Sequence, residues 1–142
     1  MPGGGRSHYP VDMFAVSVCD PLDVLKVTVE PRDIVLKPGE SKKIEITIER
    51  APGFDKNLTL DLIYRHLASP FGNSLPAGVT IDDKQSKTLL TAKELKGHIM
   101  LTAAKDAKPV EGQIVPVMAQ AAINFVMKMS YCAEPLRVTV KP

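Results

Sequence analysis

The chain has 142 residues, of which 44% are hydrophobic and 24% are charged, and its formal net charge is +2. This composition is that of one folded domain with a core of ordinary size, and it excludes a disordered chain. The basic residues form no cluster, and no apolar run is long enough to span a membrane. The sequence therefore predicts neither a nucleic-acid partner nor membrane insertion.

Apolar and polar residues alternate through the first half of the chain, which predicts β-strands because successive side chains of a strand face opposite sides. The runs lie at residues 25–30, 43–49 and 58–64. In the third run, the expected inward positions include Leu58, Leu60, Leu62 and Tyr64. Residues 65–77 contain two prolines and one glycine, and they predict a long loop.

The second half continues with shorter alternating runs. Strands are expected at residues 79–81, 89–92, 98–103 and 136–140, and a hairpin at 115–120 and 123–131. The stretch Thr91–Gly97 is expected to be a loop with at most one helical turn, since it is too short for a stable helix.

Seven to nine short strands without a long helix need two packed sheets to bury their apolar faces. We therefore expect an all-β fold, an immunoglobulin-like two-sheet sandwich. Nine residues on the apolar sides of the runs are expected to be buried: Ile44, Ile46, Ile48, Leu58, Leu60, Leu62, Ile99, Leu101 and Val138.

Four segments carry a family resemblance: VTVEP at 27–31, VLKPGES at 35–41, LPAGVT at 75–80 and LTAAKDA at 101–107. They resemble bacterial Ig-like or fibronectin-III-like modules of tandem-repeat envelope or secreted proteins of the planctomycete type. The resemblance implies a β-sandwich located extracellularly, in the periplasm or at the cell surface, whose partners are neighbouring domains of the same polypeptide. The sequence departs from the pattern at residues 65–74 and 108–112.

Residues 17–31 resemble residues 130–142, because both contain Ser-x-Cys, then Pro-Leu, then Val-Thr-Val-x-Pro. Chance similarity between two strands is the alternative to a repeat unit of a tandem array. In an array, residues 1–20 are the start of the chain and the tail of a preceding module, either linker or stray strand, and residues 21–142 are one Ig-like module. Cys19 and Cys132 then lie at opposite poles and are not bonded to each other.

The residues that catalysis or metal binding requires are scattered. The histidines are His8, His66 and His98. No serine lies in a GxSxG context, so we predict no enzyme, no cofactor and no metal site. The acidic residues that leave calcium binding as a weaker alternative are Asp82, Asp83, Asp106 and Glu111, although their spacing matches no calcium loop.

These observations favour a non-catalytic structural or spacer module of a larger envelope or secreted protein. One alternative is a protein- or glycan-binding module that uses the loop at residues 65–78, since long loops on rigid scaffolds often carry function. Its candidate contact residues are Arg65, His66, Leu67, Phe71 and Asn73. Exposure of Phe71 favours binding, whereas its burial favours the spacer. The other alternative is an accessory domain of a protease or glycosidase.

Overall fold

The computed structural model describes residues 16, 18, 23–66, 69–124 and 127–142. These residues form thirteen strands and no helix, so the fold is all-β as expected. The first seven strands are β1 (Val24–Glu30), β2 (Asp33–Leu36), β3 (Ser41–Arg50), β4 (Leu58–Asp61), β5 (Ile63–His66), β6 (Ser69–Asn73) and β7 (Val79–Ile81). The remaining six are β8 (Leu89–Leu90), β9 (Lys96–Ala103), β10 (Val110–Val115), β11 (Met118–Ala122), β12 (Lys128–Cys132) and β13 (Leu136–Val140).

The first layer is an antiparallel sheet in the order β1-β3-β9-β7. Its centre is the pairing of β3 with β9, in which Ile44 lies opposite Ile99 and Ile46 opposite Gly97. Strict alternation along β3 places Ile44, Ile46 and Ile48 on the buried face. The period-two pattern of the sequence thus sets which side of this sheet faces the core.

The second layer consists of two sheets, β10-β13-β2 and β12-β11-β4-β8, which continue into each other. β10 leads into β11 through Pro116 and Val117, and β12 leads into β13 through residues 133–135. The backbone N–H of Ala133 donates to the carbonyl of Val117 at 3.0 Å and links the two interruptions. The structure has thirteen strands instead of the expected seven to nine partly because such interruptions divide longer strands, and both of them contain a proline, which has no N–H.

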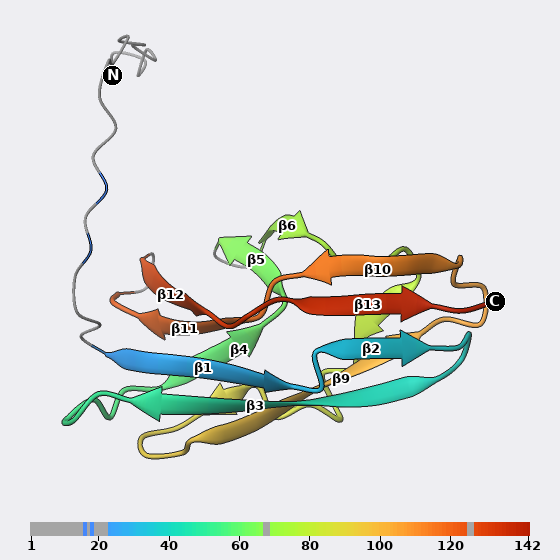
Figure 1. The fold of residues 1–142 in the computed structure, drawn as a ribbon. Helices are drawn as coiled ribbons and strands as arrows, with labels where there is room; N and C mark the ends of the chain where they lie inside the picture. The colour runs from blue at the N-terminus through green and yellow to red at the C-terminus, as the bar shows by residue number, and fades with distance from the viewer. Residues whose placement is uncertain (1–15, 17, 19–22, 67–68, 125–126) are drawn as a thin grey trace, which may run out of the picture.

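The segment of β1 and β2 belongs to both layers (Figure 1). β1 pairs with β3 in the first layer and ends at Glu30, before Pro31, and β2 then pairs in parallel with β13 in the second layer. The parallel pairing runs from Asp33 opposite Arg137 to Leu36 opposite Val140. One continuous stretch of backbone therefore joins the two layers along this side.

A single hydrophobic core lies between the layers. All nine residues that the sequence predicted to be buried have 2% or less of their surface exposed, so that prediction is confirmed. The layers approach each other closely where β9 crosses β4, because a Cβ built on Gly97 would lie 2.6 Å from Leu60 Cδ1. No helix in the described part of the chain is long and apolar enough to cross a membrane.

The two ends of the described fold lie at opposite poles of the molecule (Figure 1). β1 begins at the pole where β11 ends, and directly before β1 Asp23 Oδ2 accepts a hydrogen bond from Tyr131 Oη of β12 at 3.1 Å. β13 ends at the other pole, where the N–H of Lys141 donates to the carbonyl of Leu36 at 2.9 Å. The chain therefore passes through the fold from one pole to the other.

Candidate functional site

Four of the five candidate binding residues lie on the two strands of a β-hairpin rather than on the long loop expected at residues 65–77, so that prediction is wrong. β5 pairs with β6 from Ile63 opposite Asn73 to His66 opposite Ser69. The prolines and glycine that suggested a loop are tolerated because all five residues of β6 are exposed and Pro70 sits on a short two-stranded ribbon. Leu67 lies outside the described residues, and the structure describes no side chain for His66.

The base of the hairpin is organised by Asp61, at the end of β4. Asp61 Oδ1 accepts hydrogen bonds from the backbone N–H groups of Leu62 at 2.8 Å and Ile63 at 2.9 Å. Asp61 Oδ2 accepts from Arg65 Nε at 2.9 Å. Arg65 is thus held by an acidic neighbour within the hairpin, and its Nε is not free to bind a partner.

Asn73 also has a structural role. Its Oδ1 accepts a hydrogen bond from the N–H of Leu75 at 3.0 Å, which forms a local turn directly after β6. The next residue is tied to β10, because Gln113 Nε2 donates to the carbonyl of Ser74 at 2.6 Å. Two of the five candidate contact residues therefore stabilise the hairpin.

Two aromatic side chains of the hairpin are exposed. Phe71 is 72% exposed, and Tyr64 is 50% exposed. The register shifts between Tyr64 and Arg65, which lie opposite Gly72 and Pro70, so Phe71 lies at a β-bulge. Such a bulge changes the direction of a side chain, and here it presents Phe71 on the surface.

The exposure of Tyr64 corrects the expectation that it continues the inward face of Leu58, Leu60 and Leu62. β4 ends at Asp61, and the inward alternation continues to Leu62 but is lost within β5, where Tyr64 is exposed. Tyr64 was not predicted as a surface residue for this reason. The signal that could have indicated the break is Asp61 itself, since aspartate often accepts hydrogen bonds from the N–H groups that follow it.

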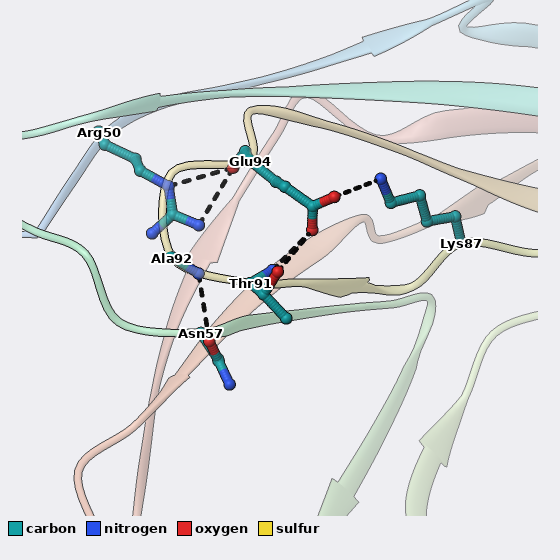
Figure 2. A network of polar contacts seen from close by, with 6 residues as sticks. All are labelled: Arg50, Asn57, Lys87, Thr91, Ala92 and Glu94. Atoms are coloured by element: carbon teal, nitrogen blue, oxygen red, sulfur yellow. Dashed lines mark hydrogen bonds and ion pairs between the residues drawn. The ribbon is translucent and has the colours of Figure 1, made fainter.

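A polar network joins three segments of the chain at the turn between β8 and β9 (Figure 2). Glu94 accepts hydrogen bonds from Lys87 Nζ at 2.7 Å, the N–H of Thr91 at 2.8 Å and the hydroxyl of Thr91 at 3.0 Å. Arg50 Nε and a second guanidinium nitrogen each donate to the carbonyl of Glu94 at 3.2 Å. Asn57 Oδ1 accepts from the N–H of Ala92 at 3.2 Å.

The hydrogen bonds of this network hold the turn between β8 and β9 against the neighbouring segments. The hydrogen bonds from Lys87 and Thr91 lower the pKa of Glu94 to about 2. A carboxylate with such a pKa is a weak base at neutral pH, because a general base works best when its pKa is near the operating pH. Arg50 also lies over the ring of Phe54, 5.4 Å from its centroid, and partial burial lowers the pKa of its guanidinium. The network therefore fixes the turn rather than activating a substrate.

A second set of polar contacts lies around residues 82–86 and β9. His98 Nε2 lies 3.0 Å from the carbonyl of Gln85, and Asp82 Oδ1 accepts from the N–H of Lys84 at 3.0 Å. Among the residues that the structure describes, no group of three or more His, Cys, Asp and Glu side chains could hold a metal ion.

Cys132 is an exposed free thiol, whereas Cys19 and His8 lie outside the described residues. The predicted absence of a bond between the two cysteines therefore stays a prediction. The expected tail of a preceding module at residues 1–20 also lies outside the described part, apart from Val16 and Val18, which are exposed.

Comparisons with known proteins give no family for this chain. No family model matches the sequence, and no curated protein matches it. One similar chain comes from a solved structure that concerns the structural basis of T cell specificity and activation by the bacterial superantigen toxic shock syndrome toxin-1. The match has a TM-score of 0.44 and 17% identity, and it covers 81% of this chain and 98% of that chain. A similarity of this size defines neither a fold family nor a function.

Proposed function

We propose that the chain is a non-catalytic immunoglobulin-like module that serves as a structural spacer in a larger envelope or secreted protein outside the cytoplasm. The division of one segment between two layers, with β1 on β3 and β2 on β13, supports the immunoglobulin-like assignment. The resemblance of residues 27–41 and 75–80 to bacterial Ig-like modules supports the same assignment.

The observation that carries the spacer function is the passage of the chain from pole to pole (Figure 1). A module that receives the chain at one pole and releases it at the other separates its neighbours by its own length. The similarity of residues 17–31 to residues 130–142 supports serial repetition of such units.

The topology also suits a spacer that is under tension. A pull on the two ends draws β2 towards the first pole through β1 and draws β13 towards the second. The parallel hydrogen bonds from Asp33–Arg137 to Leu36–Val140 then resist in shear, all at the same time. A pull between Lys37 and the C-terminus instead peels β2 from β13, because Leu36 and Val140 are paired at the same pole.

Single-molecule force spectroscopy tests this function by comparing the two pulling directions on a chain with Cys19→Ser and Cys132→Ser. One form carries handles at both termini, and the other carries handles at Lys37→Cys and the C-terminus. We expect a distinctly higher unfolding force for the terminal pull. Equal forces in the two directions, or a lower force for the terminal pull, would contradict the spacer function.

A second function is favoured by the exposed aromatic pair of the hairpin. Tyr64 and Phe71 are large, exposed and presented by a ribbon that Asp61 fixes at its base. Aromatic side chains with exposed faces are frequent contact residues for proteins and sugars. This pair therefore supports the alternative of a protein- or glycan-binding module.

NMR titration with a panel of oligosaccharides tests the glycan form of this alternative. Chemical-shift changes confined to residues 63–73, lost in Tyr64→Ala and Phe71→Ala but kept in Leu89→Ala, would support it. Leu89 is a suitable control because it is 51% exposed on β8, away from the hairpin ladder. A chain without shift changes across the panel is not a glycan-binding module for those sugars.

A further inference from the structure

The outer edge of β1 is open. Within the described residues, β1 pairs with β3 along one edge only. The other edge borders a groove of about 390 Å³ whose lining residues are Lys26, Val27, Thr28, Val29, Glu30, Arg32 and Glu134. Five of these lining residues, 26–30, are consecutive. Since successive side chains of a strand face opposite sides, a groove lined by consecutive residues runs along the edge of β1.

Two contacts close the ends of this edge. At one end, Tyr131 Oη donates to Asp23 Oδ2 at 3.1 Å, and burial together with this bond raises the pKa of Tyr131. At the other end, Arg32 forms an ion pair with Glu134. Between these contacts no strand of the described chain is hydrogen-bonded to this edge of β1, although β12 passes near it, so an extended segment can pair along residues 26–30.

The side chains of β1 have a symmetric order about Thr28. Val27 and Val29 point into the core, whereas Lys26, Thr28 and Glu30 are exposed. Within the described residues, neither Lys26 nor Glu30 forms an ion pair. The exposed face of β1 thus carries a basic residue, a hydroxyl and an acidic residue in this order. In an antiparallel copy of the strand the order is reversed, so the base of each copy can lie opposite the acid of the other.

We infer that the edge of β1 pairs antiparallel with β1 of a second copy of this chain, about a two-fold axis at Thr28. In this register Lys26 of each copy lies opposite Glu30 of the other, and Val27 lies opposite Val29. Residues directly opposite in an antiparallel pair share a face, so both ion pairs form on the exposed side. The interface is isologous and closes on itself as a dimer.

The neighbouring registers that keep apolar residues on one face are less favourable. Centring the pair on Val29 places Lys26 opposite Arg32, which brings like charges together. Centring the pair on Val27 places Glu30 opposite Val24 and Lys26 opposite Thr28, so neither charged side chain has an oppositely charged partner. Only the register centred on Thr28 forms two attractive pairs.

Features of the strand limit the pairing to the same stretch. The register with β3 shifts between Val24 and Lys26, and Pro31 has no backbone N–H to donate. The regular part of β1 is therefore residues 26–30, whose midpoint is Thr28. The edge strands β2 and β12 lack the pattern, since the exposed positions are Asp33 and Val35 on β2 and Lys128, Met129, Ser130 and Cys132 on β12.

Charge exchange tests the interface by sedimentation equilibrium under reducing conditions, from micromolar to millimolar chain. The native chain should form a dimer, and Lys26→Glu or Glu30→Lys alone should raise the dimer dissociation constant about tenfold, because both ion pairs become repulsions. An equimolar mixture of Lys26→Glu chain with Glu30→Lys chain should restore the native affinity, since every opposed pair is again attractive. Lys108→Glu is the control: Lys108 is exposed at a distant turn, and its replacement alters the net charge by as much as Lys26→Glu does. This variant should leave the dimer dissociation constant unchanged.

Cross-linking tests the register independently of affinity. In a chain with Cys19→Ser and Cys132→Ser, Thr28→Cys should form a disulfide between copies, because the axis places the two side chains opposite each other. Thr80→Cys on edge strand β7 is the control that should form no disulfide between copies. A native chain that is monomeric over the whole range, a dimer that Lys26→Glu does not weaken, or a mixture that fails to recover affinity would each overturn the inference.

Discussion

Asn57 Oδ1 accepts a hydrogen bond at 3.2 Å from the backbone N–H of Ala92, whose φ of 42° lies in the left-handed region. An L-residue with a Cβ is strained there by about 1–2 kcal/mol, and surrounding contacts must hold it. In this chain the contacts are Asn57 and the bonds that Thr91 and Glu94 form with each other across the same turn. The turn between β8 and β9 thus depends on a residue 35 positions earlier in the chain.

Ala92→Gly should stabilise the protein. Glycine adopts a positive φ without strain, and the relief of about 1–2 kcal/mol exceeds the added entropy of the unfolded chain, which is about 0.4–1 kcal/mol. We expect the free energy of unfolding in urea to rise by about 0.5–1 kcal/mol. Ala104→Gly is the control, because Ala104 has no positive φ and its replacement should only destabilise. Loss of stability in Ala92→Gly would mean that the turn is not strained.

Glu94→Gln should reduce the acid sensitivity of the fold. The pKa of Glu94 is lowered from 4.5 to about 2, chiefly by the hydrogen bond from Lys87. A lowered folded-state pKa means that the ionised form stabilises the fold above pH 4.5, and that this contribution is lost as the pH falls towards 2. Urea unfolding across this range should show a smaller decrease in stability for Glu94→Gln than for the native chain. Lys87→Met should give an intermediate slope, and equal slopes in all three chains would contradict the assigned cause.

Gly97→Ala should be strongly destabilising. Its new Cβ would lie 2.6 Å from Leu60 Cδ1 and 2.6 Å from the carbonyl oxygen of Lys87, and the backbone atom in particular moves little. Overpacking of this kind costs about 1–3 kcal/mol, which thermal or urea unfolding will measure. Gly72→Ala is the matched control, since the nearest atom to its Cβ is Tyr64 Cβ at an ordinary 3.7 Å. Comparable losses for the two variants would show that β9 and β4 are less tightly packed than the structure indicates.

Asp61→Ala and Arg65→Ala should differ in their effects. Removing the Asp61 carboxylate leaves the N–H groups of Leu62 and Ile63 without acceptors and should cost about 1–3 kcal/mol. Removing Arg65, whose side chain is 37% exposed, removes one surface ion pair worth about 0–1 kcal/mol. Hydrogen exchange of residues 63–73 will locate the loss. A larger effect for Arg65→Ala would mean that the arginine, and not the aspartate, organises the hairpin.

The sequence predicted the interior of the fold better than its surface. Alternation along β3 and β9 was sufficient to place Ile44, Ile46, Ile99 and Leu101 in the core, because burial of one face determines the side of every residue in a strand. The hairpin was missed because all five residues of β6 are exposed and offer no apolar face to bury, and the composition of this segment is that of a loop. Without an apolar periodicity, nothing local distinguishes an exposed ribbon from a loop.

The network at Glu94 was beyond local sequence reasoning for a different reason. Arg50 and Asn57 reach the turn through hydrogen bonds that span 44 and 35 positions of the chain. Both bonds are made to backbone groups, which every residue has, so the residue types give no sign of the pairing. Thr91 and Glu94 alone resembled the start of a helical turn. Their bonds to each other do form, but they close a tight turn before β9.

The separation of the start of β1 from the end of β13 at opposite poles restricts how evolution or a protein engineer can reuse this unit (Figure 1). Many domains have adjacent ends and can be inserted within a surface loop of a host or circularly permuted with a short connector. Here a connector between the ends would have to run the length of the fold and cross the groove beside β1 or the surface of a layer. Recombination can therefore append this unit before or after another domain, but it cannot splice it into a host loop without a long tether.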